Sequence, residues 1–243
     1  MIELLAEVVG WFDDPASWVG PNGIPTRLLE HVLLSAACVL TALVVAVPVG
    51  LAIGHTGRGA LIAVTVANIG RGLPSYALLL MLFPFFGIGF STAFPALLLL
   101  TIPPILTNTY VGVRDVDRDV VEAGRGMGMT EGGLLRRVEL PLALPVIVAG
   151  VRTAAVQVVA TATLAALVGG GGLGRYIVDG FALQDDGQLV GGALLVAALA
   201  VLTEWGIGVV ERRVVPPGAR AGTAGGRAPI EVATARPSLA RSG

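Results

Sequence analysis

The sequence predicts an all-α protein that crosses a membrane as a polytopic bundle of about five transmembrane helices. Composition is the first reason, because 54% of the 243 residues are hydrophobic and 14% are charged, whereas about 25% of residues are charged in soluble domains. The second reason is that five apolar segments are long enough to cross a bilayer, which takes roughly 20 helical residues. The third is that two of these segments contain several prolines, which membrane bundles tolerate better than soluble helices do.

Residues 1–27 precede the first apolar segment and form the predicted external or interfacial N-terminal segment. They carry four acidic residues and no early arginine, so they lack the basic start of a signal peptide. We expect a short amphipathic helix at the membrane surface. Trp11 and Trp18 either lie at the level of the lipid headgroups or pack within the protein.

The membrane domain is expected to cover residues 28–213. Its predicted spans are 28–54, 60–87, 91–113, 142–168 and 188–210. The first span is the most continuously apolar, and the second and third contain prolines at 74, 84, 95, 103 and 104. Because neighbouring helices can satisfy the carbonyls that a proline frees, we expect kinks or breaks there.

Arginines between the spans predict the orientation of the chain, because basic residues that flank spans are retained on the cytoplasmic side. They gather in three places, at Arg58, between residues 114 and 137, and at Arg212 and Arg213, whereas the other two connections hold only Arg175. The N-terminus is therefore expected outside and the C-terminus in the cytoplasm. Residues 214–243 mix proline, glycine, alanine and arginine without a hydrophobic period, which indicates a disordered cytoplasmic tail.

The residue inventory excludes several kinds of chemistry. All sixteen basic residues are arginines, so the chain has no lysine for a Walker A loop or a Schiff base. One cysteine, Cys38, and two histidines, His31 and His55, cannot build a Cys/His metal site, and we expect Cys38 to be a small core residue. A net charge of −1 gives no general attraction to nucleic acid.

The longest polar interruption, residues 114–141, is predicted to be a cytoplasmic loop of two short helices. Gly126 and Gly128 weaken the first helix and permit a turn, and Thr130 is positioned to cap the second. Leu134, Leu135 and Val138 share one side of the second helix, which Pro141 is expected to end. That apolar side either binds in the groove of a partner or packs on the ends of the protein's own helices.

The same loop resembles the EAA loop of the permease subunits of binding-protein-dependent ABC importers. That motif reads Glu-Ala-Ala, three residues, Gly, nine residues, Ile, one residue and Leu-Pro. Gly124 replaces the second Ala and Val138 replaces Ile, with the spacing kept throughout. The matching positions are Glu122, Ala123, Gly124, Gly128, Leu140 and Pro141.

The resemblance implies a type I ABC importer permease fold and a mechanical role for the loop. In such importers the loop forms a coupling helix in a cleft of a separate ATP-hydrolysing subunit, which binds ATP and Mg, so this chain itself would hold no cofactor and would not be an enzyme. The glycines would form the bend, Glu122 would make polar contacts, and Leu140 and Pro141 would end the helix. The other implied partners are an extracytoplasmic substrate-binding protein, a second permease copy or sister permease, and membrane lipid.

Longer stretches resemble the osmoprotectant branch of these permeases, which import glycine betaine, carnitine, choline or proline betaine. They are NIGRGLPSYALLLMLFPFFGIG, ILTNTYVGVRDVDRDVVEAGRGMGMT and LPLALPVIVAGVRTAAVQVVATATLAALVGGGGLGRYI. Methionine or another amino acid remains an alternative solute. An aromatic cage is the usual site for a quaternary ammonium, and only 5% of this chain is aromatic, so we expect selectivity to reside chiefly in the external binding protein.

Polar residues within the predicted spans are candidates for the translocation path, because burying them in a membrane is unfavourable. These candidates are Asn68, Arg71, Asn108, Gln157 and Thr161. The alternative is that they satisfy broken backbone or join helices. Arg152 either lines the path or extends to the cytoplasmic surface, and Glu204 is expected to be structural.

Three other functions fit the sequence less well. Residues 169–174 satisfy G-x-G-x-x-G but follow a membrane span instead of a strand, so we expect a bend for close helix approach and no dinucleotide site. An ion-driven secondary transporter commonly has acidic residues at the bilayer midplane, and spans one to four have no acidic residue near their middle. An intramembrane hydrolase would need a serine nucleophile with a histidine partner, and no such motif is present.

Overall fold

The computed structural model describes residues 2–61, 65 and 72–215, and the regular elements in these residues are all helical. Within these described residues, four helical segments are long and apolar enough to span a membrane. They are α2 (Ile24–Thr56), α5 (Phe90–Arg114), α8 (Leu140–Thr161), which continues into the 3₁₀ segment η3 (Ala162–Val168), and α10 (Asp186–Val214). The predicted all-helical membrane bundle is therefore confirmed.

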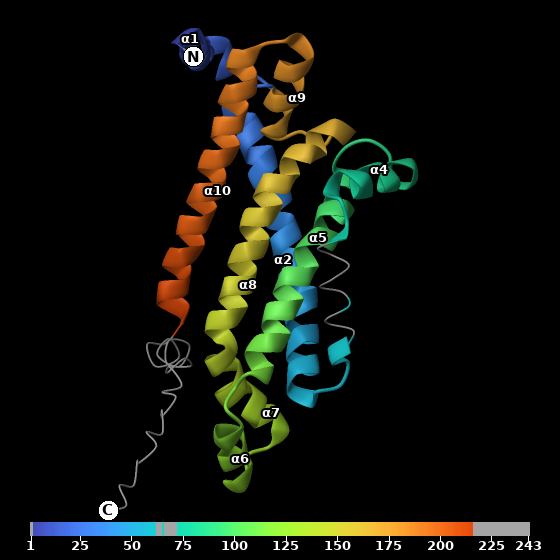
Figure 1. The fold of residues 1–243 in the computed structure, drawn as a ribbon, viewed down its shortest axis with the longest axis vertical. Coiled ribbons are helices and arrows are strands. Elements are labelled where there is room, and N and C mark those ends of the chain that lie inside the picture. Colours follow the sequence, from blue (N-terminus) through green and yellow to red (C-terminus); the bar gives the residue numbers. More distant parts are fainter. Residues whose placement is uncertain (1, 62–64, 66–71, 216–243) are drawn as a thin grey trace, which may run out of the picture.

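Short elements lie at the two ends of this bundle (Figure 1). At one end are α1 (Ile2–Asp13), η1 (Pro15–Ser17) and α9 (Gly174–Leu183). At the other end are α6 (Arg118–Gly126), α7 (Glu131–Leu134) and the π-turn η2 (Leu135–Glu139). The N-terminal helix and the loop with the EAA-like residues are thus separated by the full length of the spans.

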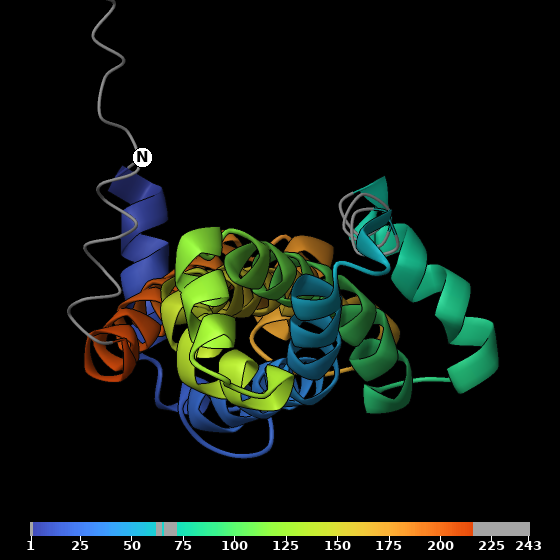
Figure 2. The same ribbon diagram turned by 90° about the horizontal axis from the view of Figure 1, so that it is seen from below.

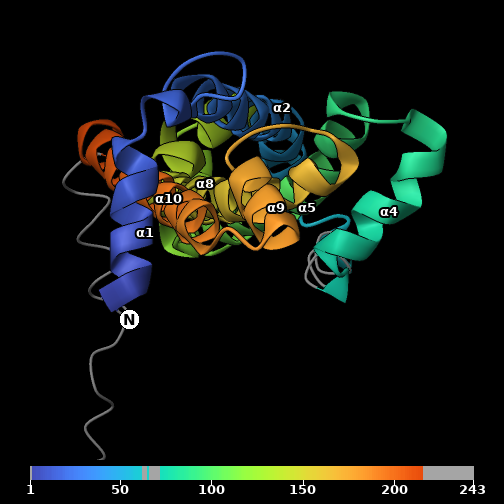
Figure 3. The ribbon, with the colours of Figure 1, turned by 90° about the horizontal axis from the view of Figure 1, so that it is seen from above.

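The second predicted span is described only in its second half, where α4 (Ser75–Phe86) follows Pro74. This helix packs on α5 and η3. Views along the bundle axis show it on the side opposite α10 (Figures 2 and 3). Asn68 and Arg71 lie outside the described residues, as does the predicted tail beyond Val215.

The centre of the bundle is formed by α2, α5 and α8, which pack closely because glycines face neighbouring helices. A Cβ atom at Gly50 or Gly54 of α2 would lie 2.7 Å from the Cβ of Thr109 or Val113 of α5. A Cβ atom at Gly150 of α8 would likewise lie 2.5 Å from the Cβ of Asn108 of α5. Small residues at such contacts let helix backbones approach one another within a membrane.

Cys38 is fully buried in a core cluster of aliphatic side chains shared by α2, α4, α5 and α8. The cluster also contains Leu79, Leu97 and Val158. The expectation of a small core residue at this cysteine is confirmed.

Residues 169–172 form a bend between η3 and α9, with Gly169, Gly171 and Gly172 at φ values of +77°, +73° and +75°. The bend lies against the start of α2, since Gly172 has His31 as its nearest neighbour. The expected glycine-rich bend is confirmed. The sequence did not predict α9 after it, which forms because Tyr176 and its neighbours pack against Leu173, Ile24 and α10.

The N-terminal helix α1 packs across α10. The ring of Trp11 contacts Tyr176 in an edge-to-face arrangement, with the two ring centroids 5.1 Å apart. Trp18 is about half exposed, and its indole nitrogen donates to the carbonyl of Phe12. Packing therefore accounts for Trp11, whereas Trp18 keeps one face open to the surroundings.

Candidate functional site

The loop between α5 and α8 contains the two helices that the sequence predicts. The side chain of Asp117 accepts a hydrogen bond from the amide of Asp119 and so caps α6, and the Thr130 hydroxyl accepts from the amide of Gly133 and caps α7. Between them Gly128 has a φ of +81°, which only glycine adopts readily. The two-helix loop with a glycine joint and a threonine cap is confirmed.

The apolar side of α7 is covered by the loop itself. Leu134 is fully buried, and it packs with Val116 and Val121 of the preceding segment and with Met129 and Val138. Of the two predicted alternatives, packing within the chain applies to Leu134, because α6 folds back over it. Val120 of α6, at 43% exposure, and Met127 of the turn after it, at 77%, are apolar side chains that this part of the loop leaves exposed.

Gly124 departs from the alanine of the family motif, and the structure gives the reason. A Cβ atom at this position would lie 2.7 Å from Cδ1 of Leu134 and 3.4 Å from the sulfur of Met129. Because Gly124 lacks the methyl group of alanine, the side chain of Leu134 on α7 can lie against this position. The departure is therefore compensated within the loop.

Glu122 and Ala123 are exposed on the outer surface of α6. Nearby, Arg125 and Glu131 hold α6 and α7 together through two hydrogen bonds of 2.9 and 3.1 Å. The hydrogen bond from Arg125 lowers the pKa of Glu131, with smaller attraction from Arg125 and His55. The same pair raises the pKa of Arg125. Glu122 thus lies on a surface whose shape is fixed by a neighbouring ion pair.

Leu140 and Pro141 do not end the second helix, contrary to the prediction. The chain runs from α7 through the π-turn η2 directly into α8, where Pro141 occupies the first turn. The amide of Leu140 bonds to the carbonyl of Leu135, five residues back. Proline has no amide hydrogen and clashes with the preceding turn of an α-helix, and the widened π-turn lies directly before the turn that holds Pro141. The loop is consequently continuous with α8.

His55, in the last turn of α2, is a contact of this loop that the sequence did not predict. Its Nδ1 lies 2.5 Å from Oε2 of Glu139, and its Nε2 lies 3.2 Å from Oε2 of Glu131. Glu139 is 4% exposed. The only sequence signal was an acidic residue directly before Leu140 and Pro141, and nothing in the spacing identified a partner 84 residues earlier.

The predicted path residues that the structure describes make contacts with helix backbone. The side-chain amide of Asn108 donates to the carbonyl of Pro104, and the Thr161 hydroxyl donates to the carbonyl of Gln157. Gln157 itself is exposed on α8, whereas Asn108 lies against Gly150. These contacts do not bring the three side chains together.

Arg152 joins α8 to α10 instead of extending alone to the surface. Its guanidinium forms an ion pair with Glu204 and lies 3.4 Å from the carboxylate of Glu211. This contact joins Glu204 of α10 to α8, and the structural role of Glu204 stays a prediction. Charged side chains within a membrane domain usually pair in this way, because an unpaired charge there is strongly unfavourable.

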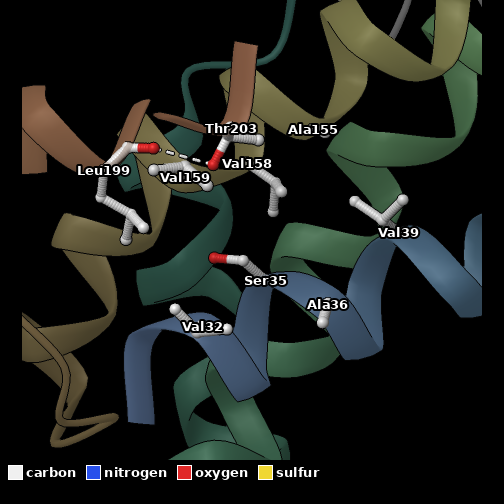
Figure 4. Close-up of a pocket in the computed structure, with 9 residues that line it drawn as sticks. All are labelled: Val32, Ser35, Ala36, Val39, Ala155, Val158, Val159, Leu199 and Thr203. Carbon is white, nitrogen blue, oxygen red and sulfur yellow. Dashed lines mark hydrogen bonds between the residues drawn. The ribbon is translucent and has the colours of Figure 1, made fainter. Parts of the chain in front are cut away.

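A cavity of about 220 Å³ lies among α2, α8 and α10 (Figure 4). The Ser35 hydroxyl points into it and has no hydrogen-bond partner among the described residues, whereas the Thr203 hydroxyl donates to Leu199. The lining residues are Val32, Ser35, Ala36, Val39, Ala155, Val158, Val159, Leu199 and Thr203. This lining offers neither an aromatic ring nor a charge to a cationic solute.

Comparison with known families accounts for this arrangement. Residues 46–216 match the sequence profile of the family described as binding-protein-dependent transport system inner membrane component. The chain belongs to this family. The match includes the whole loop and the helices on both sides of it.

Several curated relatives of this inner-membrane component are permease proteins. The glycine betaine/carnitine/choline transport system permease protein OpuCB of Bacillus subtilis is 41% identical over 78% of this chain and 87% of the relative. The carnitine transport permease protein OpuCB of Listeria monocytogenes is 40% identical over 81% of this chain and 90% of the relative. The osmoprotectant import permease protein OsmW of Salmonella typhimurium is 35% identical over 79% and 91%.

Solved structures show the same fold for this inner-membrane component. An inward-facing conformation of the MetNI methionine ABC transporter matches with a TM-score of 0.71 and 24% identity, over 84% of this chain and all of that chain. An amino acid ABC transporter crystallised with histidines matches with a TM-score of 0.62 and 18% identity, over 88% of this chain and 96% of that chain. The predicted resemblance to type I importer permeases is confirmed for the fold.

Proposed function

We propose that this chain is the membrane-spanning permease subunit of a binding-protein-dependent ABC importer for osmoprotectants such as glycine betaine, carnitine, choline and proline betaine. The observation that carries the proposal is the loop of residues 114–141. It combines the EAA-like residues on an exposed helix with a continuous connection into α8. The names of the relatives supply the solute class.

The proposed mechanism divides ATP hydrolysis and transport between chains. A separate ATPase subunit would bind ATP and Mg, since this chain has no lysine for a phosphate-binding loop. The exposed face of α6, with Glu122, Ala123 and the following Met127, would contact that subunit. Closure of two ATPases would then move the loop, and with it α5 and α8, between two arrangements of the spans.

The proposed orientation follows from the charges at the two ends of the bundle. The loop end carries Arg114, Arg118, Arg125, Arg136 and Arg137, which favours the cytoplasm. The end with α1 and α9 carries mainly acidic side chains, so the N-terminus would be outside and the C-terminus inside. Two permeases, as copies or sisters, would share one external binding protein.

We further propose that solute selectivity resides chiefly in the binding protein. The aliphatic cavity among α2, α8 and α10 lacks the aromatic side chains that recognise quaternary ammonium groups. The prediction is that the membrane complex without its binding protein binds glycine betaine only weakly. Micromolar affinity in equilibrium binding to that complex would overturn this part of the proposal.

The test of the main proposal is uptake of labelled glycine betaine at raised salt, in cells without their own compatible-solute importers. The chain is expressed with its neighbouring ATPase and binding-protein genes, and omission of each component is the control. Uptake that requires every component, and that carnitine and choline reduce by competition, is expected. No uptake with all subunits in the membrane would withdraw the solute class, and uptake of labelled methionine or another amino acid would replace it.

A further inference from the structure

We propose that His55 is a positioning residue that ties the inner end of α2 to the coupling loop, residues 114–141, so that movement of the loop is passed to the first span. The inference rests on the proposed function, because it assigns the loop a mechanical role. It concerns a residue outside the motif and outside the loop.

The geometry joins one histidine to two carboxylates on different parts of the loop. Glu139 belongs to the π-turn η2 and lies 2.5 Å from Nδ1 of His55, while Glu131 belongs to α7 and lies 3.2 Å from Nε2. The His55 side chain is 14% exposed and that of Glu139 is 5% exposed. A carboxylate buried to this extent requires a charged or hydrogen-bonding partner, and His55 provides one.

Both ring nitrogens of His55 face carboxylate oxygens, which are acceptors when ionised. A histidine with hydrogens on both nitrogens donates to one carboxylate and attracts the other, which a neutral ring cannot do at both positions. Glu131 in turn binds Arg125 of α6. The result is a chain of polar contacts, Glu139–His55–Glu131–Arg125, that connects η2, α2, α7 and α6.

Covalent continuity explains why α2 needs such a tie. The loop follows α5 through Asp115 and enters α8 without a break, so any displacement of the loop acts on those two helices through the backbone. The inner end of α2 is 75 residues or more from the acidic residues it meets, so its attachment depends on side-chain contacts. His55 is the polar part of that attachment, beside the apolar contact of Gly54 with Val113.

The test uses the complete transporter with its ATPase and binding protein in lipid vesicles, and measures glycine betaine taken up per ATP hydrolysed. His55→Ala is expected to lower this ratio about five-fold or more, the lower end of typical coupling between sites, while ATP hydrolysis continues. Glu131→Gln, which removes only the more exposed carboxylate, is expected to lower it less. Thr56→Ala is the matched control, because among the described residues that exposed hydroxyl bonds only to the carbonyl of Ala52 and to the nearby amide of Arg58, and not to the loop.

An unchanged ratio in His55→Ala would overturn the proposal. A parallel fall of uptake and hydrolysis in both His55→Ala and Glu131→Gln would also overturn it, because that result indicates a structural role alone. If His55→Ala does not assemble, His55→Gln and Glu131→Gln decide the question by the same ratio. If the parent complex takes up no osmoprotectant, the proposed solute fails, and the inference is tested by the stimulation of ATP hydrolysis by the binding protein, which His55→Ala should reduce.

Discussion

The two ends of α2 each carry a histidine that contacts distant parts of the chain, but the contacts differ in kind. At the end near α9, which we propose is the outer end, His31 is 1% exposed, its Nε2 lies 2.9 Å from the carbonyl of Val159, and the amide of Leu173 donates to its Nδ1. At the inner end His55 meets two carboxylates, one of which is largely exposed.

Hydrogen bonding fixes the chemical form of the outer histidine. Because Nδ1 accepts from Leu173, the hydrogen is on Nε2, which donates to Val159, and the ring is neutral. Beside it Glu30 accepts from the amide of Gly172 and pairs with Arg27. At the outer end both ring nitrogens of the histidine meet backbone groups, whereas at the inner end both face carboxylates, of which Glu139 is buried and Glu131 is 58% exposed. The comparison indicates that α2 is attached to backbone at its outer end and to side chains of the loop at its inner end.

The largest expected effect on stability comes from removing the outer histidine. His31→Ala would leave the Leu173 amide and the Val159 carbonyl without their partner, at a cost of roughly 1–3 kcal/mol for a buried unsatisfied group. We expect the purified His31→Ala variant in detergent to have a lower Tm than the His55→Ala variant. A larger loss of Tm in His55→Ala would reverse the comparison between the two ends.

Two glycines with positive φ sharpen the same comparison at a smaller scale. Gly172 has a φ of +75° and its added Cβ would lie 3.1 Å from Nδ1 of His31, whereas Gly128 has a φ of +81° and open space around it. Alanine in the left-handed region costs about 1–2 kcal/mol at either position. Gly172→Ala should therefore lower Tm more than Gly128→Ala, and equal losses would show that the outer packing is not tight.

The smallest expected effect is the pH dependence of the inner ion pair. The folded-state pKa of Glu131 is lowered from its ordinary value of 4.5, chiefly by the hydrogen bond from Arg125. The pair therefore contributes stability above the ordinary pKa and loses it as the pH falls through the folded-state pKa. Because the pair is exposed, the change in Tm on acidification should be small. Glu131→Gln should remove that part of the pH dependence, and an identical acid profile in the variant would assign it to other groups.

Hydropathy predicted the helical bundle and located four of the spans, because spanning a membrane requires long apolar helices whatever their tertiary contacts. Local signals also predicted the loop, since the Thr130 cap and the Gly128 turn depend on residues close in sequence. These features share one property, which is that their causes lie within a few residues.

The features that the sequence did not predict depend on contacts between distant residues. The burial of Leu134 requires α6 to fold back over α7. The π-turn arises where the loop continues into α8 at Pro141, which read in isolation as a helix end. The pairing of His55 with Glu139 joins residues that no local pattern connects.

The measurement that tests the account most directly concerns the exposed motif residue Glu122. Glu122→Arg and the matched control Asp119→Arg reverse the same charge on α6, and Asp119 lies outside the motif. Both variants are compared with the parent by uptake of labelled glycine betaine and by the amount of permease in the membrane. We predict that Glu122→Arg abolishes uptake with membrane insertion intact, while Asp119→Arg retains most of it. Unchanged uptake in Glu122→Arg would contradict the role of this loop in coupling.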